Sequence, residues 1–242
     1  MTQLLVSVRN AIEAIAAIEG LADIIDVKEP VRGSLGCATP EIITEVAAAV
    51  RSQRGATRPL SLALGELTEW RDANKTSLCH AIATAQPHFL KLGLSGVGSP
   101  QNSASWISEW QGVRHAISGS HTWVAVAYAD HENADSPAAE NVLQAAIETK
   151  CGILLIDTYV KNGTSILDHM TLDQLLAIRQ VNSSHGLKLA LAGRVTLSNL
   201  NLLLSIQPDI IAVRGAVCDQ GDRTGSVSSE LVREFRSAVH SK

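Results

Sequence analysis

Eight short apolar runs, each followed by a turn and then a longer segment with helical spacing, constrain the fold of this 242-residue chain more than any other feature. Runs this short and this continuously apolar are typical of strands buried on both faces, as in a parallel sheet. Flanking glycines and β-branched residues favour strands over fragments of buried helices. The predicted strands cover residues 4–8, 22–28, 60–65, 89–96, 122–130, 152–158, 188–193 and 209–215.

The segments between these runs are rich in alanine and leucine and have the spacing of amphipathic helices. Several begin with residues that cap helices: Thr39 stands before Pro40, Asp135 and Ser136 before Pro137, and Ser228 and Ser229 at the start of the last segment. The predicted helices cover residues 10–19, 40–53, 73–86, 103–118, 137–150, 172–185, 197–206 and 229–240.

Alternation of eight strands with eight helices predicts an α/β fold, a (β/α)8 TIM barrel, which typically takes roughly 250 residues. An open doubly wound sheet is the alternative. No G-x-G-x-x-G or P-loop pattern follows any of the runs, which counts against the nucleotide-binding form of that sheet. No low-complexity linker divides the chain. We therefore predict a single TIM-barrel domain over residues 1–242.

Composition excludes several other classes of protein. Apolar residues make up 45% of the chain, charged residues 18% and aromatic residues 3%, which excludes a disordered segment and indicates an aliphatic core. The 20 Lys and Arg residues are offset by 24 Asp and Glu residues, without a basic run, so we expect no nucleic-acid partner. No stretch approaches the roughly 18 apolar residues of a membrane span. We therefore expect no membrane partner and a cytoplasmic location.

The four cysteines lie far apart, with no C-x-x-C pair and no histidine at metal-binding spacing. This pattern predicts reduced thiols and neither a disulfide framework nor a metal site. The four residues are Cys37, Cys79, Cys151 and Cys218.

The positions of the lysines carry the most information about function. Of seven lysines, three lie at or just after the ends of the second, fourth and sixth predicted strands, namely Lys28, Lys91 and Lys161. Catalysis in TIM barrels takes place at these carboxyl ends. The three lysines are therefore candidate catalytic residues.

Alternation along the second strand indicates which side chains point into the barrel, because successive strand residues face opposite sides. The apolar Ile25 and Val27 should face the helices, which leaves Asp26 and Lys28 at the barrel mouth. The same reasoning points Lys91 inward on the fourth strand.

A lysine held among apolar neighbours and other cations loses its proton more easily and can attack a carbonyl as a free amine. A carboxylate beside it can orient it and transfer protons, and Asp157 ends the sixth strand just before Lys161. The alternative is that each acid and lysine form a structural ion pair at the barrel rim. Three lysines on alternate strands favour Schiff-base or enolisation chemistry on a small carbonyl compound.

The ends of the last two strands predict a phosphate site. Glycines there can turn backbone N–H groups into the mouth, and TIM barrels often bind phosphate between the seventh and eighth loops. Two arginines stand beside the two glycines. The candidate phosphate-binding residues are Gly193, Arg194, Arg214 and Gly215.

Five segments together resemble the (5-formylfuran-3-yl)methyl phosphate synthases, also called 4-(hydroxymethyl)-2-furancarboxaldehyde-phosphate synthases. They are ADIIDVKEPVRGSLG (22–36), FLKLGLSG (89–96), LLIDTYVKNGTSILD (154–168), LKLALAG (187–193) and IIAVRGAVCDQGDRTG (210–225). The resemblance spans nearly the whole chain. It implies a lyase of methanofuran biosynthesis that condenses two molecules of glyceraldehyde 3-phosphate into a furan aldehyde phosphate.

By this resemblance Lys28 forms the Schiff base and Lys91 accepts a proton, while Asp26, Asp157 and Lys161 match the family's other site positions. It also implies no metal or organic cofactor. The chain departs from the family after the third predicted strand, where Glu66 stands in place of an expected Asp.

Two rival functions remain open from the sequence. One is another Schiff-base aldolase of class I acting on a sugar phosphate, and the other is a barrel that binds a phosphorylated metabolite without turnover. The expected partner in each case is a small molecule, here a triose phosphate. The sequence leaves homo-oligomer formation open.

Overall fold

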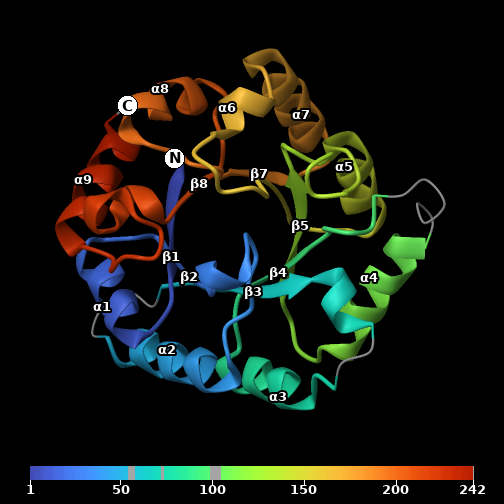
Figure 1. The fold of residues 1–242 in the computed structure, drawn as a ribbon, viewed down its shortest axis with the longest axis horizontal. Coiled ribbons are helices and arrows are strands. Elements are labelled where there is room, and N and C mark those ends of the chain that lie inside the picture. Colours follow the sequence, from blue (N-terminus) through green and yellow to red (C-terminus); the bar gives the residue numbers. More distant parts are fainter. Residues whose placement is uncertain (54–57, 72–73, 99–104, 242) are drawn as a thin grey trace.

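The computed structural model describes residues 1–53, 58–71, 74–98 and 105–241. Its strands form a closed barrel of eight parallel strands in sequence order, surrounded by helices (Figure 1). This confirms the predicted TIM barrel. The strands are β1 (Gln3–Val8), β2 (Ile24–Val27), β3 (Leu60–Glu66), β4 (Phe89–Gly93), β5 (Thr122–Tyr128), β6 (Ile153–Asp157), β7 (Lys188–Leu191) and β8 (Ile210–Val213).

The helices follow the strands as the sequence predicts, with small shifts at those ends that the structure describes; the predicted starts at residues 73 and 103–104 lie outside the described residues. Short 3₁₀ helices after β2, β3 and β8 and the short helix α6 (Ile166–His169) were not predicted. None of the described helices is long and apolar enough to cross a membrane. The other helices are α1 (Ala11–Glu19), α2 (Pro40–Ser52), α3 (Thr76–Ala85), α4 (Ser105–Ala116), α5 (Ala139–Glu148), α7 (Leu172–Ser184), α8 (Leu197–Ser205) and α9 (Ser229–His240).

Two of the three predicted helix caps are confirmed. Thr39 and Ser228 accept backbone N–H groups at the starts of α2 and α9. The cap predicted at Ser136 is wrong, because the buried Ser136 hydroxyl has no hydrogen-bond partner among the described residues. Helix α5 consequently begins later, after Ala138, whose side chain makes no cap.

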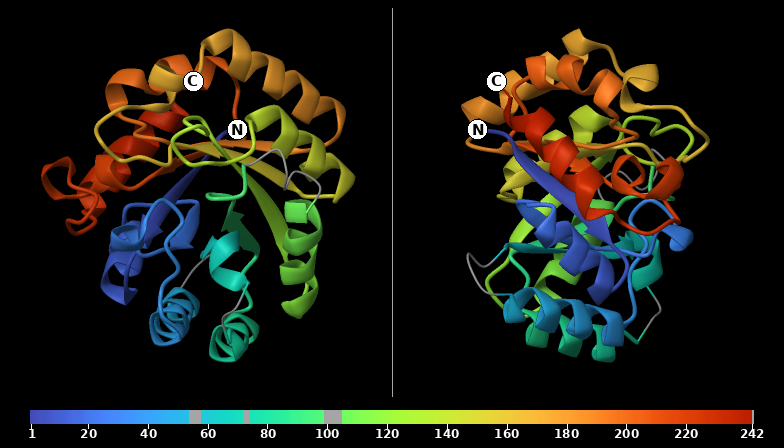
Figure 2. Two further views of the ribbon diagram at one scale, coloured as in Figure 1. Left: turned by 45° about the vertical axis from the view of Figure 1, so that its right-hand side comes forward. Right: turned by 90° about the vertical axis from the view of Figure 1, so that its left-hand side faces the viewer.

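The barrel closes where β1 pairs with β8 on one side and β2 on the other. The N-terminal residues continue this seam, since the Thr2 hydroxyl donates to the Pro208 carbonyl at 2.8 Å. The N-terminus and α9 lie on the same side of the molecule (Figures 1 and 2).

Alternation along the strands produces two apolar layers. Ile25 and Val27 belong to the layer between barrel and helices, as predicted. A smaller cluster fills the inside of the barrel, including Leu5, Val126 and Leu155. These apolar side chains fill the part of the barrel interior away from the carboxyl ends of the strands. The polar side chains that point into the barrel therefore meet at those carboxyl ends.

Candidate active site

The carboxyl ends of the strands surround a cavity of about 470 Å3. Asp26 lies beneath it and is completely buried. The other predicted site residues all line this cavity: Lys28, Lys91, Asp157, Lys161, Gly193, Arg194, Arg214 and Gly215. The fold therefore gathers residues from five strand ends, those of β2, β4, β6, β7 and β8, into one space.

Lys91 and Asp26 form a buried ion pair at the floor of this cavity. The Lys91 Nζ lies 2.8 Å from Asp26 Oδ2, and the Ser7 hydroxyl on β1 donates to the same oxygen at 2.8 Å. Burial alone would raise the pKa of Asp26, but the charges of Lys91 and Lys28 outweigh burial and lower it. Asp26 is therefore a carboxylate at neutral pH.

Lys28 follows β2 and is only 9% exposed. Its Nζ donates to the Ser34 carbonyl at 3.3 Å. Burial, reinforced by the charges of the two other site lysines, lowers the pKa of Lys28 to about 7, although Asp157 and Asp26 act against this. A substantial fraction of Lys28 is therefore a neutral amine near pH 7.

Asp157 at the end of β6 is held as a carboxylate. Its Oδ1 accepts the Lys161 Nζ at 2.8 Å and the Thr158 N–H at 2.8 Å. Burial alone would raise the pKa of Asp157, but the charges of Lys161 and Lys28, with these hydrogen bonds, lower it to about 2. Asp157 consequently supplies a fixed negative charge.

Ser34 connects the loop after β2 to the end of β6. Its hydroxyl is completely buried and lies 3.1 Å from Asp157 Oδ2 and 2.9 Å from the Thr158 carbonyl. Its own carbonyl accepts the Lys28 amine. One residue thus positions both Lys28 and Asp157.

The loop after β7 brings Arg194 across the mouth of the barrel. Gly193 and Arg194 both have left-handed backbones, with φ of 90° and 50°. A Cβ on Gly193 would lie 2.9 Å from Thr158 Cγ2, so only glycine allows the loop to approach β6 this closely. The exposed Arg194 side chain extends toward the loop after β6, where its Nη1 lies 3.1 Å from the position that a Cβ on Gly163 would take.

The Arg214 guanidinium donates all five of its N–H groups to protein acceptors. Its Nη1 and Nη2 bind the two carboxylate oxygens of the buried Glu13 at 2.9 and 3.3 Å. The other three donors bind the carbonyls of Ser7, Arg223 and Gly225. In this arrangement Arg214 holds the loop after β8. Contact between its side chain and a phosphate, suggested by the sequence, would require one of these bonds to break.

Sequence reasoning missed two residues of the cavity region, Ser34 and Arg223. Arg223 lines the cavity and donates from Nη2 to the Gly33 carbonyl at 3.1 Å. Both missed residues stand in loops, where no periodicity indicates the direction of a side chain. Their signals were closeness in sequence to Lys28 and to the predicted phosphate loop, and their position inside two of the segments that carry the family resemblance.

Glu66, at the position where the chain departs from the family pattern, is not among the residues that line the cavity. It accepts the Tyr128 hydroxyl at 2.6 Å and the Ser95 N–H at 2.8 Å. Burial raises the pKa of Glu66. Its described contacts connect the end of β3 to β5 and to the loop after β4.

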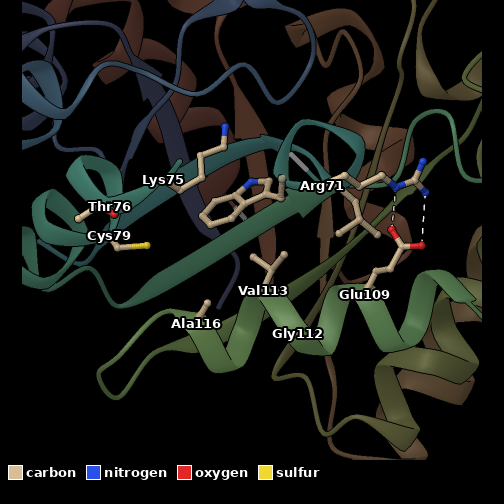
Figure 3. Close-up of a pocket in the computed structure, with 10 residues that line it drawn as sticks. Arg71, Lys75, Thr76, Cys79, Glu109, Gly112, Val113 and Ala116 are labelled. Atoms are coloured by element: carbon tan, nitrogen blue, oxygen red, sulfur yellow. Dashed lines mark hydrogen bonds and ion pairs between the residues drawn. The ribbon is translucent and has the colours of Figure 1, made fainter. Parts of the chain in front are cut away.

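A second, larger cavity of about 810 Å3 lies outside the barrel, between α3 and α4. Figure 3 shows Arg71 and Glu109 facing each other at one end of it, with Cys79 at the other. None of the predicted site residues lines it. Because catalysis in this fold takes place at the strand ends, the smaller cavity is the candidate active site.

Solved structures with the same architecture are similar to this chain at low sequence identity. Thiamine phosphate pyrophosphorylase from Pyrococcus furiosus has a TM-score of 0.63 and 15% identity, covering 99% of this chain and 96% of that chain. Phosphoribosyl anthranilate isomerase from Thermus thermophilus has a TM-score of 0.62 and 15% identity, covering 99% of each. These similarities support the fold alone.

Curated relatives are similar over nearly the full length. Two proteins named (5-formylfuran-3-yl)methyl phosphate synthase illustrate this. The one from Archaeoglobus fulgidus is 33% identical over 241 residues, covering 98% of this chain and 99% of the relative. The one from Methanopyrus kandleri is 30% identical over 238 residues, covering 98% of both. A family model described as 4-HFC-P synthase matches residues 4–236. Nearly the whole barrel is thus shared with enzymes named as synthases, and the chain belongs to the 4-HFC-P synthase family.

Proposed function

We propose that this enzyme is a (5-formylfuran-3-yl)methyl phosphate synthase, a lyase that condenses two molecules of glyceraldehyde 3-phosphate through a Schiff base on Lys28. The proposal includes a cytoplasmic role in methanofuran biosynthesis. The observation that carries it is the buried Lys28, whose pKa of about 7 gives it a free amine inside a cavity rich in cations. The names of the relatives support the choice of product.

In the proposed reaction the Lys28 amine attacks the carbonyl of the first triose phosphate, and loss of water gives an iminium ion. The iminium makes the neighbouring C–H acidic. Lys91, which the family resemblance implies as the proton acceptor, takes this proton. Asp26, 2.8 Å from the Lys91 Nζ, stabilises the ammonium that results.

Removal of that proton leaves an enamine, whose electrons expel phosphate from the next carbon as the C–O bond breaks. The remaining three-carbon unit joins the second triose phosphate through a new C–C bond. Ring closure and loss of water form the furan, and hydrolysis of the imine releases the aldehyde product and restores the free Lys28 amine. The net reaction converts two molecules of triose phosphate into one molecule of product, one phosphate and two molecules of water. It involves no net oxidation or reduction.

Formation of product from glyceraldehyde 3-phosphate tests this function directly. We expect an ultraviolet chromophore to appear together with one phosphate for each furan formed. An aldolase of class I would give a condensation product but would release no phosphate and form no chromophore. A binding protein would leave glyceraldehyde 3-phosphate unchanged. Either of these results would exclude the proposed reaction.

The pH dependence of the reaction should follow the Lys28 amine. Because only the neutral amine attacks the carbonyl and its pKa is about 7, kcat/KM should fall about tenfold for each pH unit below this value and level off above it. Initial rates measured across this range at constant ionic strength check the prediction. A profile without a change near pH 7 would contradict the assignment of Lys28 as nucleophile.

A further inference from the structure

The charges around the cavity divide into two groups. Among the residues that the structure describes, six cationic side chains line it. Three are neutralised by carboxylates at 2.8–2.9 Å, and three form no ion pair within the described part of the chain. The paired cations are Lys91, Lys161 and Arg214, and the others are Lys28, Arg194 and Arg223.

Lys28 is the nucleophile of the proposed reaction, so Arg194 and Arg223 remain as cations available to a ligand. They come from different loops, after β7 and after β8. A guanidinium is well suited to bind phosphate, since it offers several N–H donors in one plane. Two free guanidinium groups match a reaction whose two substrates each carry a phosphate.

Arg223 lies close to the segment that holds Lys28. Its Nη2 binds the carbonyl of Gly33, while the Lys28 Nζ binds the carbonyl of the next residue, Ser34. Both cations therefore converge on one short stretch of backbone. Arg223 retains N–H donors for which the described residues provide no acceptor.

Other charged groups face Arg223 as well. The negatively charged groups are Asp157, Asp222 and Glu29, and the positively charged group is Arg214. The Asp222 carboxylate accepts the backbone N–H and hydroxyl of Thr224 at 2.8 Å. Glu29 accepts the Val31 N–H at 3.0 Å. These acids hold their own loops and form no ion pair with Arg223.

Resting on the function proposed above, we propose that the cavity contains two separate phosphate subsites. Arg223 binds the phosphate of the triose attached to Lys28, which is the phosphate that leaves. Arg194, on the loop after β7, binds the phosphate that the product retains. A cation at the leaving phosphate stabilises the charge that develops as its C–O bond breaks.

Trapping of the Lys28 iminium with cyanoborohydride tests the role of Arg223. The two probes are glyceraldehyde 3-phosphate and glyceraldehyde, which differ only in the phosphate. The wild type should be trapped faster with the phosphorylated probe. In Arg223→Gln the ratio of the trapping rates with the two probes should fall about 10- to 100-fold, which is the effect of removing a hydrogen bond to a charged group. Arg194→Gln should keep the preference in trapping yet lose furan formation.

Arg233→Gln, on the outer face of α9, is the matched control and should behave as wild type. Retention of the phosphate preference by Arg223→Gln, or its loss in Arg194→Gln, would overturn the assignment. Thermal unfolding of each variant verifies that it is folded.

Equilibrium binding of glycerol 3-phosphate, which has no carbonyl and needs no Schiff base, tests the two subsites separately from the chemistry. We expect two molecules bound per wild-type chain and one per chain in each arginine variant. A single molecule bound to the wild type would refute the inference even if the furan is formed. Absence of furan with two molecules bound would refute only the proposed function.

Discussion

Lys28→Met is expected to lower furan formation by about 10⁴-fold or more, because it removes the nucleophile on which every later step depends. The same substitution should abolish the covalent adduct that borohydride traps with glyceraldehyde 3-phosphate. Peptide mass spectrometry of the wild-type adduct should locate it on Lys28. An adduct on Lys91 or Lys161 instead would contradict the assignment.

Lys188→Met is the matched control for this substitution. Lys188 is exposed and begins β7, at the opposite end of the barrel from the cavity, so its loss should leave the rate unchanged. Lys28→Met should also unfold at a higher temperature than the wild type. The lowered pKa of Lys28 means that its charged form is less favourable in the folded protein than in water, and methionine removes that cost.

Glu13→Ala is expected to destabilise the protein by about 3–5 kcal/mol, the usual cost of leaving one partner of a buried ion pair alone. Glu13 and Arg214 are 3% and 4% exposed in this pair, so water cannot replace the lost carboxylate. Urea unfolding monitored by circular dichroism measures the difference. Arg71→Ala, which removes an exposed ion pair, is the control and should cost less than about 1 kcal/mol.

Glu13→Gln keeps the shape of the side chain and should lower the stability less than Glu13→Ala does. It is therefore the variant to measure if Glu13→Ala does not fold. Burial alone would raise the pKa of Glu13, but Arg214 lowers it. The stabilisation is therefore present at neutral pH and is lost as the pH falls through the folded-state pKa. A Glu13→Ala variant as stable as Arg71→Ala would contradict this account.

The same pair has a consequence for the site. Arg214 also binds the carbonyls of Arg223 and Gly225, so loss of Glu13 should loosen that loop. We therefore expect KM for glyceraldehyde 3-phosphate to rise in Glu13→Gln.

The sequence predicted the barrel well because its strands repeat one local pattern eight times. The inward direction of Lys28 and Lys91 followed from alternation with apolar neighbours, and the structure agrees. The role of Arg214 did not follow, since its partner Glu13 stands 201 positions away. Nothing near Arg214 in the sequence indicates that pairing. The role of Ser34 was not predicted for a similar reason. Its hydroxyl contacts Asp157, which lies at the end of a strand far away in the sequence.

The seam between β1 and β8 determines when the chain can fold during its synthesis. β1 lacks one neighbour until β8 has been made, and Glu13 on α1, which also pairs with the partly exposed Arg9, lacks its buried cation until Arg214 follows β8. Packing α1 earlier would bury the Glu13 carboxylate without its buried partner, with only Arg9 beside it. We expect the nascent chain to stay open, with an unpaired strand edge exposed. It should therefore depend on chaperones until the last strand leaves the ribosome.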